Sequence, residues 1–265
     1  MNREEVKDLK PSALRALIRD GRWTDHTIGL AADYVQANLV ILPRHYAFDF
    51  LVFCQRNPKP CPVLEVTEPG DPRIRYMAQE ADLRTDLPMY RVFKDGVCVD
   101  EVSDVNSLWR DDLVGFLLGC SATFEYALIR ANIRLRHIEE GKITPAYVSG
   151  IPCNRAGPFS GPMVVSMRPI RYDQVLQAAR VTSRYTATHG GPVHIGDPAA
   201  IGITDLNEVM FGEPVEIRDN ELPVFWACGI TPQAVALQAR PEFMITHLAG
   251  HMFVTDLLAD EIAVG

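Results

Sequence analysis

The sequence predicts an α/β fold, and three observations support this class. Apolar runs in the second half of the chain repeatedly end in a polar or small residue and then a turn. Two of these turns, Asp197-Pro198 and Thr231-Pro232, place a capping side chain before a proline, as at the start of a helix. The chain has 265 residues, 47% hydrophobic and 23% charged, so it can bury a core of ordinary size. Strand, short turn and helix in succession are the pattern of an α/β fold.

The first part of the chain predicts two helices, a strand and a loop. Helical spacing of apolar residues over 14–18 predicts a helix that ends at Gly21. A second helix is expected over residues 27–39. Aromatic and apolar residues alternate over 46–52, as in a half-buried strand, and the prolines of 57–62 indicate a loop.

The next part of the chain predicts a β-hairpin followed by helices. Residues 90–102 carry aromatic and β-branched side chains on both arms of a turn at Asp95-Gly96. Residues 111–119 are apolar enough for a buried helix, and the two leading aspartates suit a helix N-terminus. A further helix is expected over 124–129.

Four polar residues stand where predicted strands of the second half end. These residues are Arg168, Asp197, Cys228 and His247. In open α/β sheets, ligands bind at the carboxyl ends of the strands and near helix N-termini. We therefore expect the four side chains to converge on a binding site.

Charge and cysteine usage restrict the class of partner. The net charge of −8 argues against general binding to nucleic acid or to an anionic membrane. The six cysteines are scattered without a CxxC pair, which is typical of reduced thiols in a cytoplasmic protein. No stretch has the length and apolar character of a signal peptide or a spanning helix. We expect a small carboxylate as the partner, and a homodimer is compatible with the sequence.

Residues 155–169 form an unusual segment with two glycine-proline turns. Gly157 and Gly161 each precede a proline on either side of Ser160, and such turns can present backbone N–H groups to an anion. Arg155 and Arg168 flank the segment, and a guanidinium can bind a carboxylate through two hydrogen bonds. The alternative is a rigid loop whose arginines pair with nearby acidic side chains.

Residues 184–198 bring candidate acid–base groups together. Arg184, His189, His194 and Asp197 fall within this span. A histidine can transfer protons near neutral pH, and a carboxylate can orient it. The alternative is that both histidines are structural.

Further candidates are two cysteines, two histidines and a glutamate. Cys228 precedes a predicted helix, whose N-terminus would activate a thiol, although the apolar residues before it favour a structural role. Cys153 lies among turn residues and is an equal candidate for a reactive thiol. His247 and His251 are four residues apart and could bind zinc, but a zinc-protease motif is absent. Glu125 could act as an acid or base if it is buried.

Several long motifs give the chain a resemblance to a known family. These motifs are ADLRTDLPMYRVFKDG, SLWRDDLVGFLLGCS, RHIEEGK, IPCNRAGPFSGPMVVSMRP, HGGPVHIGDP, PVFWACGITPQAV and ITHLAGHMFVTDL. Their order and spacing resemble those of a family of bacterial hydro-lyases whose domain also occurs in the mitochondrial D-glutamate cyclases. The chain departs from the family pattern at Ser149-Gly150, where Thr-Asn is common, and at Leu248-Ala249, where Ala-Pro is common.

The resemblance implies an architecture and an activity. It suggests a three-layer α/β/α core with a smaller two-layer α+β lobe. We expect residues 1–118 and 190–265 to form the larger α/β domain and residues 119–189 the smaller lobe. The implied reaction is dehydration of D-glutamate to 5-oxo-D-proline, and no cofactor is expected.

A mechanism can be written for this reaction from the candidate residues. Arg155, Arg168 or Arg184 would hold the carboxylates, and backbone amides of residues 157–161 would stabilise the oxyanion. His189 or His194 would act as acid or base, oriented by Asp197. Three alternatives remain: dehydration of a small hydroxy acid, noncatalytic carboxylate binding, and zinc-dependent hydrolysis.

Overall fold

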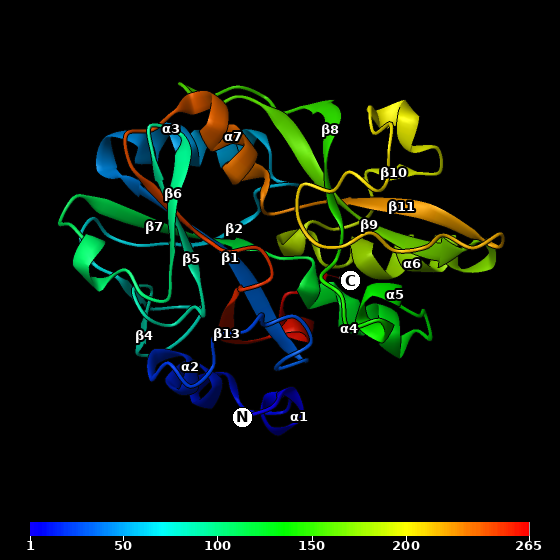
Figure 1. Cartoon of the computed structure of the whole chain (residues 1–265), viewed down its shortest axis with the longest axis horizontal. Coiled ribbons are helices and arrows are strands. Elements are labelled where there is room, and N and C mark those ends of the chain that lie inside the picture. The colour runs from blue at the N-terminus through cyan, green and yellow to red at the C-terminus, as the bar shows by residue number, and fades with distance from the viewer. Residues whose placement is uncertain (265) are drawn as a thin grey trace.

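The chain folds around two antiparallel β-sheets that lie next to each other (Figure 1), as seen in a computed structural model that describes residues 1–264. The larger sheet has seven strands in the order β2-β7-β1-β12-β5-β6, and β13 pairs with β1. The smaller sheet has the order β10-β11-β9-β8. A short pair, β3-β4, is separate from both sheets. No helix within residues 1–264 is long and apolar enough to cross a membrane.

The larger sheet draws its strands from both ends of the chain. They are β1 (Tyr34–Pro43), β2 (Val63–Val66), β5 (Tyr90–Lys94), β6 (Val97–Val102), β7 (Leu113–Gly119), β12 (Met244–His247) and β13 (Phe253–Leu258). Central strand β1 is buried along nearly its whole length, and its side chains pack alternately into two hydrophobic cores. Leu39 and Ile41 face one core, and Val40 and Leu42 face the other.

Each face of the larger sheet has its own cover. Helices α3 (Arg44–Arg56) and α7 (Thr231–Ala239) contribute to the core that contains Val40. The opposite face is covered by the segment around β3 (Arg73–Ile74) and β4 (Ala81–Asp82). At the N-terminus, α1 (Arg3–Val6) and α2 (Pro11–Arg19) form a small core with β13.

The smaller sheet is built from the middle of the chain. Its strands are β8 (Ala146–Pro152), β9 (Pro162–Arg171), β10 (His194–Ile195) and β11 (Glu221–Ala227). One face packs against α4 (Ala122–Arg130) and α6 (Val175–Ser183), where Phe124 lies near Trp226. The remaining helical segments are short: α5 (Arg136–Glu139), η1 (Asn106–Leu108), η2 (Tyr172–Gln174), η3 (Thr186–Thr188), η4 (Pro198–Ile201) and η5 (Ala259–Glu261).

Several predicted elements are confirmed. The hairpin at Asp95-Gly96 joins β5 to β6, and the helix predicted over 124–129 lies within α4. The helix predicted over 14–18 lies within α2, and Gly21 follows it with a positive φ of 66°.

Three predicted elements are wrong, and burial explains two of them. Residues 34–39 start strand β1, and residues 113–119 form strand β7, where helices were expected. Both strands are buried on both faces, so their apolar residues do not alternate with polar ones. Residues 46–52 belong to helix α3 although their aromatic side chains alternate; Phe48 is 75% exposed.

The mixture of helices and strands confirms an α/β protein. The antiparallel pairing of its strands, however, contradicts the expectation that successive strands of the second half end at the same edge of a sheet. Within residues 1–264, every strand pair of the two sheets is antiparallel, so consecutive strand ends lie at opposite edges. Arg168 lies inside β9 and not at its end. The smaller sheet includes β11, so a lobe built on that sheet would extend past residue 189 to Ala227. The division into a larger domain and a lobe stays a prediction.

Candidate functional site

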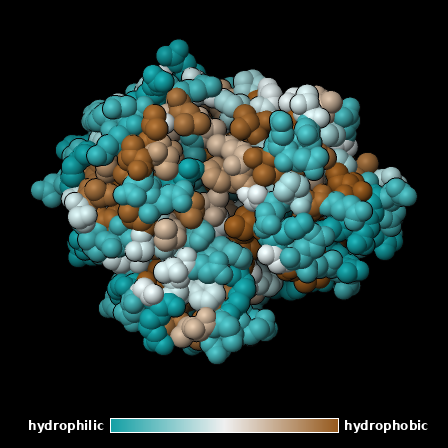
Figure 2. Space-filling view, in the orientation of Figure 1, coloured by the Kyte–Doolittle hydropathy of each residue, from teal (hydrophilic) through white to brown (hydrophobic). Residues whose placement is uncertain are grey.

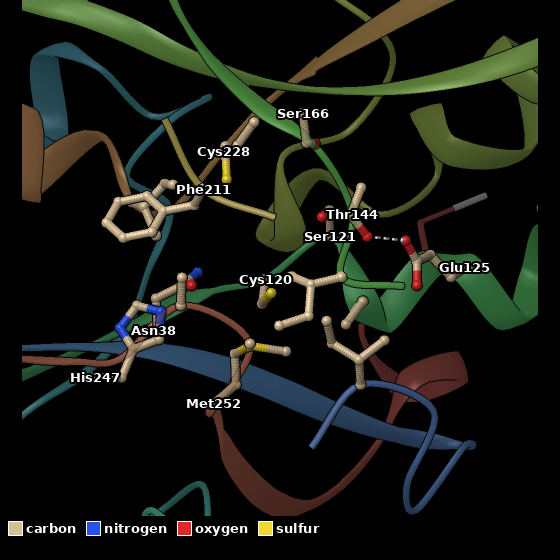
Figure 3. Close-up of a pocket in the computed structure, with 17 residues that line it drawn as sticks. Asn38, Cys120, Ser121, Glu125, Thr144, Ser166, Phe211, Cys228, His247 and Met252 are labelled. Atoms are coloured by element: carbon tan, nitrogen blue, oxygen red, sulfur yellow. Dashed lines mark hydrogen bonds between the residues drawn. The ribbon is translucent and has the colours of Figure 1, made fainter. Parts of the chain in front are cut away.

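A pocket lies where the two sheets meet. It encloses an empty space of about 480 Å³, which includes part of its open mouth. β1 and β12 of the larger sheet line it, as do β8 and β9 of the smaller sheet. Figure 2 shows apolar side chains gathered around a hollow near the middle of one face of the molecule. The polar residues that line the pocket are Asn38, Cys120, Ser121, Glu125, Thr144, Ser166, Cys228 and His247 (Figure 3).

Two strand–turn–helix units bring helix N-termini to this pocket. Strand β7 ends at Gly119, and Cys120 and Ser121 lead directly into α4. Strand β11 ends at Ala227, and Cys228 leads through a short turn into α7. A helix N-terminus carries partial positive charge and free N–H groups, so each unit favours an anionic ligand group.

A buried ion cluster centred on Arg168 lies directly behind one wall of the pocket, because its partners Ser121, Glu125 and Ser166 line that wall. The Arg168 side chain is 1% exposed, and Glu125 is 2% exposed. Arg168 donates to Glu125 Oε1 from Nε at 2.9 Å and from Nη2 at 2.5 Å. It also donates to Ser166 Oγ and Ser121 Oγ, each at 3.0 Å. These four hydrogen bonds use four of the five N–H donors of the guanidinium and hold Glu125 in place at the pocket.

The Glu125 carboxylate is charged despite its burial. Burial would raise its pKa, but His137 and Arg168 outweigh that effect and lower the pKa to about 2. His137 Nε2 lies 3.1 Å from Oε1, out of line for a good hydrogen bond. Thr144 donates to the same oxygen at 3.5 Å, as the dashed line in Figure 3 shows. The pocket thus has one fixed carboxylate at neutral pH.

His247 supplies a neutral hydrogen-bond donor on the other side of the pocket (Figure 3). Burial lowers its pKa to about 4, so the ring is uncharged at neutral pH. The Leu39 backbone N–H donates to His247 Nδ1 at 3.2 Å, and the Leu39 carbonyl oxygen lies farther from the same nitrogen, at 3.4 Å. We assign the ring proton to Nε2 from the shorter contact. Within residues 1–264, Nε2 is buried without a hydrogen-bond partner. An unpaired buried donor at a pocket is suited to bind a ligand oxygen.

Asn38 lies beside His247 and is held by the backbone. Its Nδ2 donates to the Gly119 carbonyl oxygen at 2.8 Å. Gly229 passes so close that an added Cβ would lie 1.8 Å from this nitrogen. A glycine at position 229 is therefore required for the approach of the α7 turn to β1.

The glycine-proline turns of residues 155–161 are not among the residues that line the pocket. Arg155 is exposed, and its Nε donates to the Gly157 carbonyl oxygen at 3.0 Å. Gly157 approaches Asp49 of α3, where an added Cβ would lie 2.3 Å from the carboxylate. Ser160 is half-buried, and Gly161 lies next to Val235 of α7.

His194 and Asp197 do not form the expected pair. His194 Nε2 contacts the backbone oxygen of Asp197 at 2.7 Å, and the Asp197 carboxylate accepts from the Ala199 N–H at 3.0 Å. The carboxylate caps the short helix η4 and so does not orient the imidazole, which corrects that expectation. Arg184 is exposed, and its Nε donates to the Val264 carbonyl oxygen at 3.3 Å.

The other candidates lie outside the pocket lining as well. His189 is buried with a φ of 81°, its Nδ1 lies 2.6 Å from the Lys59 carbonyl oxygen, and burial lowers its pKa to about 4. His251 Nδ1 lies 3.0 Å from the Ala249 carbonyl oxygen. Cys153 is buried in an apolar cluster, and burial raises its pKa to about 11. The structure brings together Glu125, Arg168, Cys228 and His247, but none of the other predicted site residues.

Sequence reasoning missed several residues of this pocket. They are Asn38, Cys120, Ser121, Thr144, Ser166 and, behind Glu125, His137. One signal was available: Cys120 follows an apolar run just as Cys228 does. The apolar run before Cys120 predicts a helix because it does not alternate, so its sequence does not mark Cys120 as a strand end.

The fold and the pocket together define a mixed α/β protein with a partly open pocket where its two sheets meet. Within residues 1–264, no three or more His, Cys, Asp and Glu side chains are grouped to hold a metal ion.

Comparison with known proteins identifies the family. The D-glutamate cyclase family profile matches residues 114–256, a range that contains Cys120, Glu125, Arg168, Cys228 and His247. A protein of Bacillus licheniformis named "Putative hydro-lyase" is 58% identical over 98% of this chain and 99% of its own length. Proteins of the same name from Stutzerimonas stutzeri and Bacillus subtilis are each 54% identical, over 100% and 97% of this chain and 100% of their own lengths. The chain belongs to this family, which confirms the resemblance and the enzyme class of hydro-lyases.

Solved structures add little. A nitrogen repressor-like protein from Methanococcus jannaschii covers 92% of this chain and 97% of its own at 10% identity and a TM-score of 0.39. A likeness at this level supports no statement about function.

Proposed function

We propose that the chain is a hydro-lyase for a small carboxylate and that its reaction is the dehydration of D-glutamate to 5-oxo-D-proline. One observation carries this proposal: a charged Glu125 and an unpaired His247 donor face the same pocket. The family relationship supports the reaction class, because the matching profile is that of D-glutamate cyclase.

The pocket has a group for each charged part of this substrate. The Glu125 carboxylate would hold the α-ammonium, since the two opposite charges attract strongly in a buried site. The N-termini of α4 and α7 would favour the α-carboxylate. His247 Nε2–H would donate to the oxygen of the γ-carboxyl group, where negative charge develops when nitrogen attacks.

The protons of this reaction balance without a net base. An ammonium and a carboxylate give an amide and water, and both hydrogens of the water come from the ammonium. A carboxyl group with a pKa of about 2 is a weak base, so Glu125 would orient the ammonium and relay its proton to the departing oxygen. The Thr144 hydroxyl, 3.5 Å from Glu125 Oε1, lies close enough to take part in that relay.

A second candidate is the dehydration of a small hydroxy acid. The printed name of the relatives, "Putative hydro-lyase", favours it, because that name does not specify a substrate. The same His247 donor could then bind the carboxylate of the hydroxy acid.

The test is a turnover assay of the purified chain followed by ¹H NMR. D-Glutamate, L-glutamate, 5-oxo-D-proline and small hydroxy acids would be offered separately. We expect D-glutamate to give 5-oxo-D-proline, and Glu125→Gln to lower kcat/KM roughly a hundredfold because the ammonium loses its counter-charge. Arg155→Ala is the control, since Arg155 lies outside the pocket lining. Turnover of a hydroxy acid alone would replace the first candidate by the second.

A further inference from the structure

Two cysteines occupy equivalent positions in the two sheets and line the same pocket. Cys120 follows the last residue of β7 and precedes α4, and Cys228 follows the last residue of β11 and precedes α7. Both helices have nine residues. In Figure 3 the two side chains enter the pocket from different sides, with His247 and Asn38 to one flank and Ser121 and Thr144 to the other.

Backbone N–H groups point at both sulfur atoms. Burial raises the pKa of Cys120 to about 12, while the Ala122 N–H acts in the opposite direction. Burial also raises the pKa of Cys228, and the N–H groups of Ile230 and Gly229 oppose this effect. The Arg168 guanidinium favours the thiolate at both positions. Burial therefore keeps each sulfur protonated, while the backbone N–H groups and the Arg168 guanidinium would stabilise a negative charge on it.

An independent feature of the pocket indicates the ligand. His247 is 1% exposed, and its Nε2 has no partner within residues 1–264. This donor suits a carboxylate oxygen, and it suits still better the enolate-like carboxylate that forms when a neighbouring carbon loses a proton. Glu125 offers a counter-charge for an ammonium in the same space.

We propose that Cys120 and Cys228 stand on opposite faces of the α-carbon of a bound amino acid and exchange its α-proton. The substrate class is a small α-amino acid or its lactam with a free α-carboxylate. The activity is hydrogen exchange at the α-carbon with interconversion of the D and L forms. This inference uses the pocket and substrate class of the proposed function but does not depend on lactam formation.

The step is balanced within the chain and its substrate. One thiol first releases its proton to solvent; as thiolate it takes the α-proton and becomes a thiol again. The electron pair of the broken C–H bond stays on the substrate and spreads into the α-carboxylate, which for this exchange binds His247 Nε2–H in place of the γ-carboxyl group. The other sulfur, as thiol, delivers its proton to the opposite face and becomes the thiolate. The reverse turnover restores the first state, and no oxidant or co-reactant is required.

The electrostatics restrict when this exchange can occur. Burial disfavours a thiolate at both positions. The ammonium of an amino acid brings a positive charge beside the sulfur atoms, which favours the thiolate in a site of low dielectric. Exchange should therefore be faster for an amino acid than for its lactam, which has no ammonium.

The experiment follows the α-hydrogen in D₂O by ¹H NMR and the enantiomers by chiral chromatography. The probes are D-glutamate, L-glutamate and 5-oxo-D-proline with the full chain. We expect deuterium at the α-carbon and formation of the opposite enantiomer. Cys120→Ser and Cys228→Ser should each slow interconversion at least roughly a hundredfold. Each variant should keep exchange without inversion for one enantiomer, and the two variants should favour opposite enantiomers. Cys98→Ser, on β6 outside the pocket lining, is the matched control.

The outcomes separate this inference from the proposed function. Exchange without 5-oxoproline formation supports the inference and removes the lactam reaction. Lactam formation without exchange overturns the inference and leaves the proposed function standing. Exchange that persists with inversion in both folded serine variants also overturns it. If neither reaction occurs with these probes, both proposals fail.

Discussion

Arg168 and Arg155 are two arginines of one sequence segment that meet opposite environments. Arg168 is 1% exposed and donates four hydrogen bonds to Glu125, Ser121 and Ser166. Arg155 is exposed, and its side chain donates to a backbone oxygen of its own loop. A buried charge is stable only when its partners are built around it, while an exposed charge is solvated by water. The comparison shows that the fold buries Arg168 beside the pocket and leaves Arg155 in solvent.

Replacing each arginine by alanine should give the largest contrast. Arg168→Ala leaves Glu125 charged and buried without its main partner, so we expect a loss of about 3–5 kcal/mol in the free energy of unfolding. Arg155→Ala should change it by less than about 0.5 kcal/mol. Urea denaturation followed by circular dichroism measures both values. Equal losses in the two variants would contradict the comparison.

A second contrast concerns the histidines of the two regions. His247→Gln removes the buried Nε2 donor from the pocket, and we expect kcat to fall by roughly 10²–10³ if this donor stabilises an oxyanion. His194→Gln should leave kcat nearly unchanged, because His194 contacts a backbone oxygen outside the pocket lining. The turnover assay identifies the substrate, and steady-state kinetics on that substrate measures kcat for both variants. A larger loss of kcat in His194→Gln would contradict this prediction and would indicate that the active site includes residues 184–198.

The pH dependence of stability tests the charge state of the enclosed cluster. Burial opposes the charge of Glu125, yet His137 and Arg168 lower its pKa from 4.5 to about 2. A depressed carboxyl pKa contributes stability that is complete above the unfolded pKa and is lost as the pH falls through the folded pKa. The contribution of Glu125 should therefore decline between pH 4.5 and about 2. Urea denaturation at several pH values should show this decline in the wild type and a weaker one in Glu125→Gln.

Glycine substitutions extend the contrast to the backbone. Gly229→Ala would place a Cβ 1.8 Å from Asn38 Nδ2, and the shift needed to relieve this overlap should cost about 1–3 kcal/mol. Gly150→Ala, on β8, meets no atom closer than 3.4 Å and should cost less. Thermal denaturation of both variants measures the difference. Equal melting temperatures would show that the approach of the α7 turn to β1 is not tight.

The sequence could predict part of the site because some of its signals are local. An apolar run followed by a turn and Thr231-Pro232 points to Cys228, although Thr231 is the first residue of α7 and not its cap. FMITH points to a strand that ends at His247. The same local rule would have found Cys120 if residues 113–119 had been read as a strand. Strand β7 is buried on both faces, so its sequence lacks the alternation that identifies a strand, and Cys120 is not recognisable as a strand end.

What the sequence determined by itself was the set of short-range features and the family. The turn at Asp95-Gly96, the start of α7 and the run of family motifs all depend on neighbouring residues. What only the tertiary structure decided was the pairing of strands and the enclosure of charge. Glu125, His137 and Arg168 meet because α4, α5 and β9 pack together, and their pairing depends on desolvation by segments distant in the chain. Hydrogen-bond geometry is largely local, whereas desolvation depends on every segment that excludes water from a group, so residue order alone did not reveal which arginine would be buried.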